Sequence, residues 1–263
     1  MKSNIKPNKM KKFIILVYGL LAYLVFLISF LYAIAFVGDF LVPKTINSEA
    51  ESTGLSAIIM NLVLLSIFAI QHSIMARPAF KAWWTEIIGK SAERSTYILL
   101  TSLALLLLFW KWQPINTVVW EVENSSIVLL LIGISALGWG IVLLSTFMIS
   151  HFELFGLTQI FDNFKNSTSQ SSIFQTNFLY KIVRHPIMLG FIIAFWATPV
   201  MTFGHLLFSV VTTVYILIAV KYLEEKDLRK TLGKDYEEYQ QNVPMIIPFS
   251  KRVKKKKSRP LRY

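Results

Sequence analysis

The chain has 263 residues, of which 54% are hydrophobic and 16% are charged, and its mean hydropathy is +0.54. A soluble domain carries roughly 25% charged residues, so the composition excludes a soluble globular enzyme and a disordered chain. The lack of cysteine excludes disulfides, thiolate nucleophiles and cysteine-ligated metal centres. The net charge of +12 is compatible with nucleic-acid binding, but in a membrane protein such an excess marks the segments that stay in the cytoplasm. These features predict an integral membrane protein.

Uncharged apolar runs, taken in chain order, predict the membrane segments. A bilayer core about 30 Å thick requires roughly 20 apolar helical residues. The first four runs cover residues 13–37, 55–75, 95–110 and 127–149, and Trp110 and Trp112 flank the third as interfacial aromatics would. The fifth run, residues 187–220, is too long for one crossing and holds Pro199 and Gly204 near its middle, which favours a hairpin of two short helices. We therefore expect an all-α polytopic bundle with about six membrane segments.

The loops between these segments alternate in their content of Lys and Arg. Residues 1–12, 38–54, 76–94, 111–126, 150–186 and 221–263 hold 5, 1, 4, 1, 3 and 13 of them. Because basic residues accumulate on the cytoplasmic side, the alternation predicts six crossings with both termini in the cytoplasm. We expect one domain over residues 1–263, with basic tails at 1–12 and 250–263, four segments within 13–149, a cytoplasmic loop at 150–186, the hairpin at 187–220 and a cytoplasmic helix within 221–249. The basic tails are expected to contact anionic lipid, and not nucleic acid.

Ionisable side chains gather at the predicted cytoplasmic ends of the segments. They are His72 and Arg77 after the second segment, His151 after the fourth, Arg184 and His185 before the hairpin, and Glu224 and Glu225 after it. Charged groups at that depth usually face an interior cavity, so we expect a polar pocket that opens to the cytoplasm. Other interpretations stay open, because a lone histidine at a helix end is more often interfacial and Arg77 can be a positive stop after a span. The three histidines could converge on zinc, but none has a partner at i+3 or i+4, and we expect no metal.

The last third of the chain has a more specific pattern. Arg184-His185-Pro186 and Gly190 open the hairpin, and Glu224-Glu225, Tyr236, Tyr239 and Val243-Pro244 follow it. Over residues 180–249 this spacing resembles the membrane methyltransferases that include isoprenylcysteine carboxyl methyltransferase and the phospholipid methyltransferases. Further upstream, HSIMARPAFKAWW (72–84), ERSTY (93–97), FWKWQP (109–114) and HFELFGLTQ (151–159) resemble the methanethiol S-methyltransferase branch of these NnrU-like proteins.

The resemblance implies an enzyme that methylates methanethiol to dimethyl sulfide with S-adenosylmethionine as the donor. It implies that residues 221–249 form a cofactor-site helix, and that the cofactor is bound by Arg184, His185, Pro186, Gly190, Glu224, Glu225, Tyr236 and Tyr239. Physically, an arginine can fork onto the donor's carboxylate, and adjacent glutamates on a helix point about 100° apart, so we expect Glu224 and Glu225 to have different partners. Tyr236 and Tyr239 either close the site or pack on the membrane surface.

Methyl transfer to sulfur requires a thiolate, and a thiol with an ordinary pKa of about 8.5 is mostly protonated at neutral pH. We expect His151 or His72 to accept the thiol proton and Arg77 to support the thiolate. Two alternatives remain open. One is a lipid acceptor, either a prenylcysteine carboxylate or a phospholipid amine, and the other is a non-catalytic membrane accessory protein. The expected location is the cytoplasmic membrane, and the sequence does not give the oligomeric state.

Overall fold

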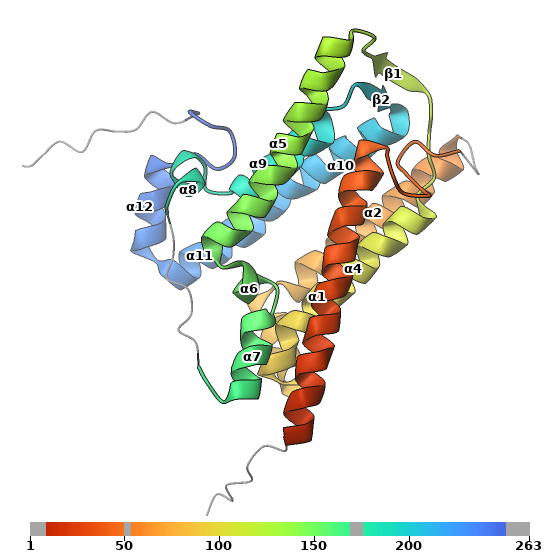
Figure 1. The fold of residues 1–263 in the computed structure, drawn as a ribbon. Helices are drawn as coiled ribbons and strands as arrows, with labels where there is room; N and C mark the ends of the chain where they lie inside the picture. The colour runs from red at the N-terminus through yellow and green to blue at the C-terminus, as the bar shows by residue number, and fades with distance from the viewer. Residues whose placement is uncertain (1–8, 50–53, 169–175, 251–263) are drawn as a thin grey trace, which may run out of the picture.

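The structure, a computed structural model, describes residues 9–49, 54–168 and 176–250 as a bundle of tilted helices (Figure 1). Within these residues five helices are long and apolar enough to cross a membrane. They are α1 (Lys9–Gly38), α2 (Leu55–Met75), α4 (Lys90–Lys111), α5 (Ser125–Ile149) and a continuous helix over Phe203–Leu232. The expected all-α polytopic fold is confirmed. Most of both basic tails lies outside the described residues, so their contact with lipid stays a prediction.

The remaining elements are shorter. The Phe203–Leu232 helix consists of α10 (Phe203–Ile218), a π-helical turn η1 (Ala219–Glu224) and α11 (Glu225–Leu232). The other helices are α3 (Pro78–Ile88), α6 (His151–Leu154), α7 (Leu157–Lys165), α8 (Leu179–Ile182), α9 (Pro186–Trp196) and α12 (Lys234–Asn242). Two strands, β1 (Val118–Glu121) and β2 (Val200–Thr202), pair antiparallel.

Two membrane segments differ from the sequence prediction. Helix α4 begins at Lys90, five residues before the apolar run that starts at residue 95. Its first turn is polar, so the helix is longer than the apolar run that hydropathy detects. The hairpin is confirmed as two helices, but only α9 is short. Its 11 residues rise about 16 Å, roughly half of a bilayer core, whereas α10 continues through η1 into α11.

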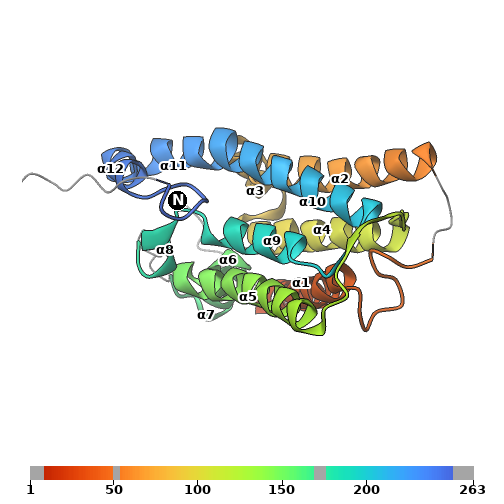
Figure 2. The same cartoon turned by 90° about the horizontal axis from the view of Figure 1, so that it is seen from above.

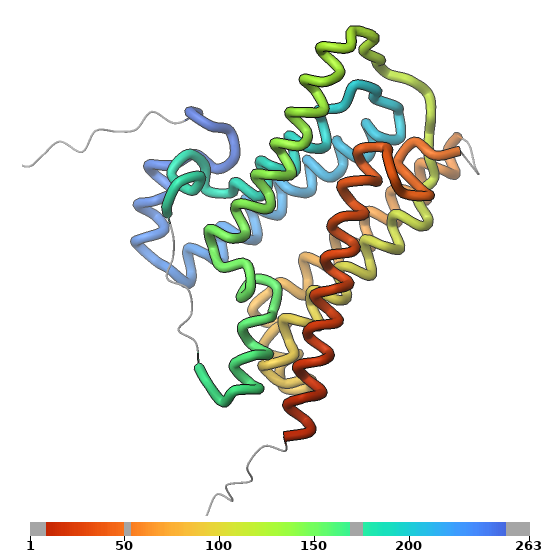
Figure 3. Tube along the Cα trace, in the orientation of Figure 1, coloured from red at the N-terminus to blue at the C-terminus, as the bar shows by residue number. Residues whose placement is uncertain are grey.

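The helices form two groups, shown by the Cα trace in Figure 3 and from above in Figure 2. Helix α4 packs on α1 and α2 in one group, and α5 packs along α9, beside α10, in the other. A Cβ on Gly190 would lie 2.7 Å from the Gly138 carbonyl oxygen, and a Cβ on Gly138 would lie 2.7 Å from that of Gly190. Small residues at this crossing therefore allow α5 and α9 to approach closely.

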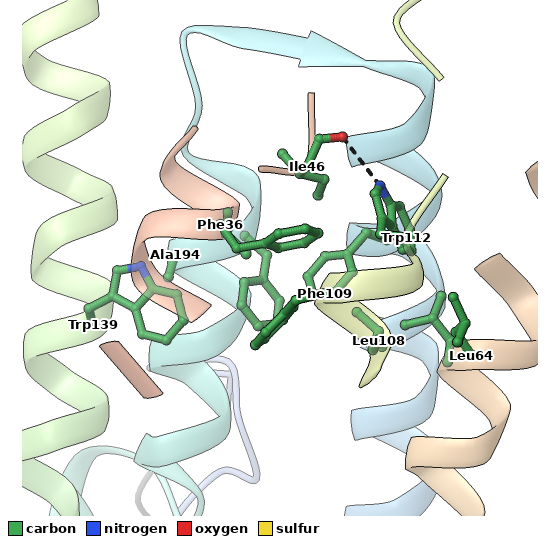
Figure 4. Close-up of a cluster of buried hydrophobic side chains, with 12 residues drawn as sticks. Phe36, Ile46, Leu64, Leu108, Phe109, Trp112, Trp139 and Ala194 are labelled. Atoms are coloured by element: carbon green, nitrogen blue, oxygen red, sulfur yellow. Dashed lines mark hydrogen bonds between the residues drawn. The ribbon is translucent and has the colours of Figure 1, made fainter. Parts of the chain in front are cut away.

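At one end of the bundle, which we call the strand end, the loops after α1, α4 and α9 meet around β1 and β2. A cluster of buried aromatic and aliphatic residues joins the two helix groups there (Figure 4). Trp112 is fully buried and its Nε1 donates to the Ile46 carbonyl at 3.2 Å, while Trp110 is exposed. The expectation of two interfacial tryptophans is thus wrong for Trp112, because the chain folds back over it after α4.

The opposite end, which we call the charged end, collects the described parts of the loops that the charge alternation placed in the cytoplasm. Lys12 of α1 contacts Asn166 after α7, Arg94 of α4 contacts the Leu154 carbonyl, and Arg77 contacts Asp227 of α11. The alternation of loops between two ends is therefore present in the structure. The assignment of the charged end to the cytoplasm stays a prediction.

Candidate functional site

The segment before α9 carries the first part of the site. Pro186 occupies the first turn of α9, where backbone N–H groups have no acceptor within the helix, so the lack of an N–H in proline costs no hydrogen bond. The two residues before it pair with the chain that follows α12, since the Arg184 N–H donates to the Pro244 carbonyl at 2.9 Å and the His185 N–H donates to that of Met245 at 3.1 Å. This pairing fixes the Arg184 and His185 side chains beside α11.

Arg184 and Glu225 form a buried ion pair at this point. Arg184 Nε donates to Glu225 Oε1 at 2.7 Å, Nη2 donates to the same oxygen, and Nη1 donates to the carbonyls of Gln240 and Val243. Gln240 Nε2 donates to the second carboxylate oxygen at 3.0 Å. Every guanidinium nitrogen is therefore bonded within the protein. In this geometry Arg184 cannot also form the expected bidentate contact with the carboxylate of the donor, because its guanidinium already donates to Glu225 and to the Gln240 and Val243 carbonyls.

Glu224 and Glu225 share one partner and differ in exposure. His185 Nδ1 lies 3.5 Å from Glu224 Oε2, and Nε2 lies 3.2 Å from Glu225 Oε1. Both carboxylates, at the junction of η1 and α11, reach the same imidazole through different ring nitrogens, while Arg184 and Gln240 bind Glu225 alone. The expectation of different partners in the bound cofactor stays a prediction. The Glu225 side chain is 7% exposed, whereas that of Glu224 is 45% exposed. Glu224 is thus the acid that remains open to a ligand.

The charge on His185 follows from these contacts. Burial lowers the pKa of His185, but its hydrogen bonds with the two glutamates outweigh that effect and raise the pKa to about 8. The imidazolium form therefore predominates at neutral pH. It holds Glu224 next to the buried pair, so that His185 positions the exposed carboxylate.

Tyr236, Tyr239 and Gly190, which were also expected to bind the cofactor, make contacts within the protein, and their role toward the cofactor stays a prediction. Tyr236 is buried with its hydroxyl 3.5 Å from Glu225, and the Tyr239 hydroxyl donates to the Tyr180 carbonyl at 2.5 Å. Burial is the main reason why the pKa values of both phenols are raised. These contacts dock α12 onto α8 and α11. Gly190 lies within α9 at the crossing with α5, and not in a turn.

His72 lies on the other helix group and faces the site. The Tyr97 hydroxyl is 3.0 Å from His72 Nδ1, and the ring of Phe68 stacks on the imidazole at a centroid distance of 5.4 Å. The Arg94 guanidinium lies over the Tyr97 ring, 5.2 Å from its centroid. The Glu224 carboxylate is close enough to interact electrostatically with both His72 and Tyr97. The two groups therefore face each other across Glu224 and His72.

His151 is less accessible than His72. Its Nδ1 is 2.8 Å from the Thr146 hydroxyl and its Nε2 is 2.9 Å from the Tyr23 hydroxyl, so both ring nitrogens are occupied. The imidazole is buried against Phe147 and Phe155, and burial lowers its pKa. This arrangement ties α6 to α1 and α5 and leaves no ring nitrogen for a substrate.

Arg77 bridges the two groups. Its Nη1 is 2.8 Å from Asp227 Oδ2 on α11, and its Nε donates to the Ser73 carbonyl at 3.0 Å. Ser73 in turn contacts the Tyr215 hydroxyl of α10 at 2.9 Å. Arg77 is thus more than a positive residue after a span, because it links α2 and α3 to α11.

The structure also adds residues that sequence reasoning missed. Arg94 and Tyr97 contact or face His72, and Asp227 neutralises Arg77. Arg94 and Tyr97 lie within the ERSTY stretch, which indicated the family in the sequence but did not indicate what either residue does. As for metals, the described residues hold no group of three or more His, Asp or Glu side chains that could bind an ion.

Residues 60–245 match the family described as NnrU protein. The chain belongs to this family. It is similar to Methanethiol S-methyltransferase 1 of Bradyrhizobium diazoefficiens, with 51% identity over 246 residues that cover 94% of this chain and 86% of the relative. The Methanethiol S-methyltransferase of Mycobacterium tuberculosis is 49% identical over 243 residues, 92% of this chain and 99% of that protein.

The chain is more distantly similar to Nurim of Mus musculus. The two are 28% identical over 183 residues, which cover 66% of this chain and 69% of Nurim. No solved structure matches the chain. Family membership confirms the resemblance drawn from the motifs, and together with the apolar helices it identifies an integral, multi-pass membrane protein.

Proposed function

We propose that this protein transfers the methyl group of S-adenosylmethionine to methanethiol, giving dimethyl sulfide and S-adenosylhomocysteine, at the cytoplasmic face of the cytoplasmic membrane. The observation that supports this most is the identity of about half of all aligned positions, over nearly the whole chain, with relatives named methanethiol S-methyltransferase. The charged end supplies a site of suitable chemistry between the two helix groups.

The residues present fit a sulfonium donor. The donor, when bound, supplies an electrophilic methyl group together with a positive sulfur and an α-amine. Glu224 offers a half-exposed carboxylate for such cationic groups, and the imidazolium of His185 together with the buried Arg184–Glu225 pair holds that carboxylate in place. Glu225 and Arg184 do not bind the donor themselves in this proposal. Their charges are already paired inside the protein, and the pair holds His185 and Glu224 in place.

Of the two histidines expected to accept the thiol proton, His72 has the more suitable surroundings. Its two ring nitrogens have a single neighbour, the Tyr97 hydroxyl at 3.0 and 3.2 Å, and Glu224 acts on it electrostatically, whereas each nitrogen of His151 has a partner of its own. The acceptor binds on the His72 side and the donor on the Glu224 side. An in-line displacement requires this opposed placement, since the nucleophile must approach the methyl group from the face opposite the leaving sulfur.

The test is headspace dimethyl sulfide from membranes supplied with methanethiol and S-adenosylmethionine, with S-adenosylhomocysteine binding to the purified protein measured in parallel. Glu224→Gln keeps the side-chain size but removes the charge, and we expect its affinity for S-adenosylhomocysteine to fall about 10- to 100-fold. Asp235→Asn removes an exposed carboxylate from α12 and serves as the matched control.

The outcomes separate the competing functions. Product from the wild type, lost with Glu224→Gln and kept with Asp235→Asn, supports the proposal. Tight binding of S-adenosylhomocysteine without dimethyl sulfide would overturn the acceptor and favour a lipid acceptor, either a prenylcysteine carboxylate or a phospholipid amine. Neither binding nor product would favour a non-catalytic accessory protein.

A further inference from the structure

Three basic side chains converge beside His72 and Tyr97 at the charged end. Arg77 follows α2, Lys81 lies on α3 and Arg94 lies on the first turns of α4. Arg94 lies over the Tyr97 ring, Arg77 donates to Ser73 of α2, and Phe80 and Trp84, which flank Lys81 on α3, pack against the buried cluster that includes Tyr97. The charges of Arg77 and Arg94 both act on Lys81, as expected for cations in one region. Like charges gathered at a partly buried position repel one another, and the arrangement therefore requires negative charge nearby.

Within the part of the chain that the structure describes, only one of the three cations is in a direct ion pair with a carboxylate. Arg77 is paired with Asp227 at 2.8 Å. Among the described residues, no carboxylate lies within the 4 Å of an ion pair from Lys81 or Arg94. Arg94 donates through Nε to the Leu154 carbonyl at 2.6 Å and lies over the Tyr97 ring, and its two Nη groups have no hydrogen-bond acceptor in the described ranges of the chain. Burial, with the charges of Arg94 and Arg77, lowers the pKa of Lys81 and outweighs the opposite effect of the Glu93 and Asp227 carboxylates, neither of which is in a direct ion pair with it.

The walls around these cations are aromatic. Tyr97 and Met75 form a buried cluster against which Phe80, Trp84 and Phe155 pack. The indole Nε1 of Trp84 is buried and has no hydrogen-bond partner among the described residues. An apolar wall with an unused N–H donor, beside two cations that are in no direct ion pair with a described carboxylate, suits a small ligand that is apolar on one side and anionic on the other.

We propose that Lys81 and Arg94 form the subsite for the methanethiolate sulfur and lower the free energy of the thiolate relative to the thiol. This inference rests on the proposed function and names the residues that activate its acceptor. It assigns Arg77 a different task, that of holding α2 and α3 against α11 through Asp227. The thiolate subsite thus belongs to the α2–α4 group, opposite Glu224.

The chemical step balances without further reactants. The thiol proton passes through His72 to solvent, and a lone pair of the thiolate sulfur forms the new sulfur–carbon bond. The bond between the methyl carbon and the donor sulfur breaks, and its electron pair stays on that sulfur as a neutral thioether. Lys81 and Arg94 stabilise the thiolate before the step and lose this interaction when neutral dimethyl sulfide forms, which favours product release.

Other ionisable groups face the same place and define the background of the test. The basic or neutral ones are His72, Arg77, Tyr97 and Tyr215, and the acidic ones are Glu93, Glu224 and Asp227. None of them is changed in the variants below. A shift seen in those variants therefore reports the cation that was removed.

The measurement is the pH titration of thiolate absorbance for methanethiol bound to the complex of the protein with S-adenosylhomocysteine, which cannot turn over. An opposite charge within about 4–6 Å lowers the pKa of a group by about one to three units. We expect the bound thiol to titrate below free methanethiol. In Lys81→Gln or Arg94→Gln its midpoint should move up by about one pH unit, with the acid limb of kcat moving by the same amount.

Matched variants keep this test decisive. Arg94→Lys retains the charge and should restore most of the shift, while Lys90→Gln removes an exposed cation from the start of α4 and should leave the midpoint unchanged. The affinity for S-adenosylhomocysteine should stay within about two-fold of wild type in all four variants. Each variant is first checked for the wild-type unfolding temperature.

The possible failures are distinguishable. If the wild type makes dimethyl sulfide but neither Gln variant moves the midpoint, the thiolate subsite is elsewhere and the proposed function stands. If both variants instead weaken S-adenosylhomocysteine at least ten-fold with no change in the midpoint, the cations hold the donor's carboxylate, and the inference is wrong. If the wild type makes no dimethyl sulfide at all, the proposed function fails first.

Discussion

The two ends of the bundle are stabilised in different ways. At the strand end, buried polar groups are paired with the backbone and enclosed by aromatic rings, as when Asn61 exchanges two hydrogen bonds with the backbone of Gln113 at 2.7 and 2.8 Å. At the charged end, the buried polar groups are ionised and bind one another, as in the contacts among Arg184, His185 and Glu225. The buried polar groups of one end are neutral and closed off, whereas the other end keeps accessible charge on Glu224 and, on Lys81 and Arg94, charge that is in no direct ion pair with a described carboxylate.

The comparison shows where this protein can have a ligand-dependent site. Neutral hydrogen bonds and apolar contacts depend little on pH, so the strand end fixes the positions of the helices. Ionised groups respond to pH and to bound charge, so the charged end can change when a ligand arrives. Changes at the strand end should therefore alter stability alone, while changes at the charged end should alter stability, pH dependence and affinity together.

The largest effect is expected from breaking the Arg184–Glu225 pair. Arg184→Gln or Glu225→Gln leaves one buried charge without its partner, which costs about 3–5 kcal/mol of unfolding free energy. The double variant Arg184→Met/Glu225→Leu leaves neither charge and should be more stable than either single variant. Thermal unfolding in detergent measures all three. Single variants as stable as the wild type would show that the pair does not hold α11 to the segment before α9.

An intermediate effect is expected at the strand end. Asn61→Leu removes both hydrogen bonds between the buried Asn61 side chain and the Gln113 backbone, and we expect a loss of about 3 kcal/mol, since each disrupted buried hydrogen bond costs about 1–3 kcal/mol. The affinity for S-adenosylhomocysteine should not change. Asn116→Ala removes an exposed hydrogen bond at the same end and should cost less than about 1 kcal/mol. A large loss of affinity in Asn61→Leu would mean that the two ends are not separable.

The smallest effect depends on pH. The pKa of His185 is about 8 in the folded protein and about 6.5 in an unfolded chain, so its charge stabilises the fold fully below pH 6.5, and this contribution is lost as the pH rises through 8. His185→Gln should therefore lower stability by about 2 kcal/mol at pH 6 and by little at pH 9. Unfolding temperatures between pH 6 and 9 measure this difference. The Asn61→Leu curve should run parallel to that of wild type, and an equal loss at both pH values in His185→Gln would contradict the assigned charge.

Sequence patterns predicted the segments and the residues of the site better than their roles. Apolar runs and loop charges gave the bundle, and the Arg184-His185-Pro186 and Glu224-Glu225 motifs pointed to the charged end, because hydropathy and motif spacing are both local properties. The roles depended on partners distant in the chain. Arg184 is paired with Glu225, Nε2 of His151 is bonded to Tyr23, and Arg94 is bonded to the Leu154 carbonyl, and none of these contacts can be predicted from neighbouring residues.

By itself, the sequence determined that the chain is an all-α membrane protein with ionisable groups at one set of helix ends and a methyltransferase-like motif in its last third. The reason is that a bilayer allows few alternatives, since backbone polar groups in lipid must be satisfied within helices or closed barrels. Only the tertiary structure decided which charges are paired inside the protein and which remain accessible to a ligand. Glu224 and Glu225 are adjacent and chemically identical, yet one is buried against Arg184 and the other half exposed, because exposure is set by the surrounding elements and not by the residue.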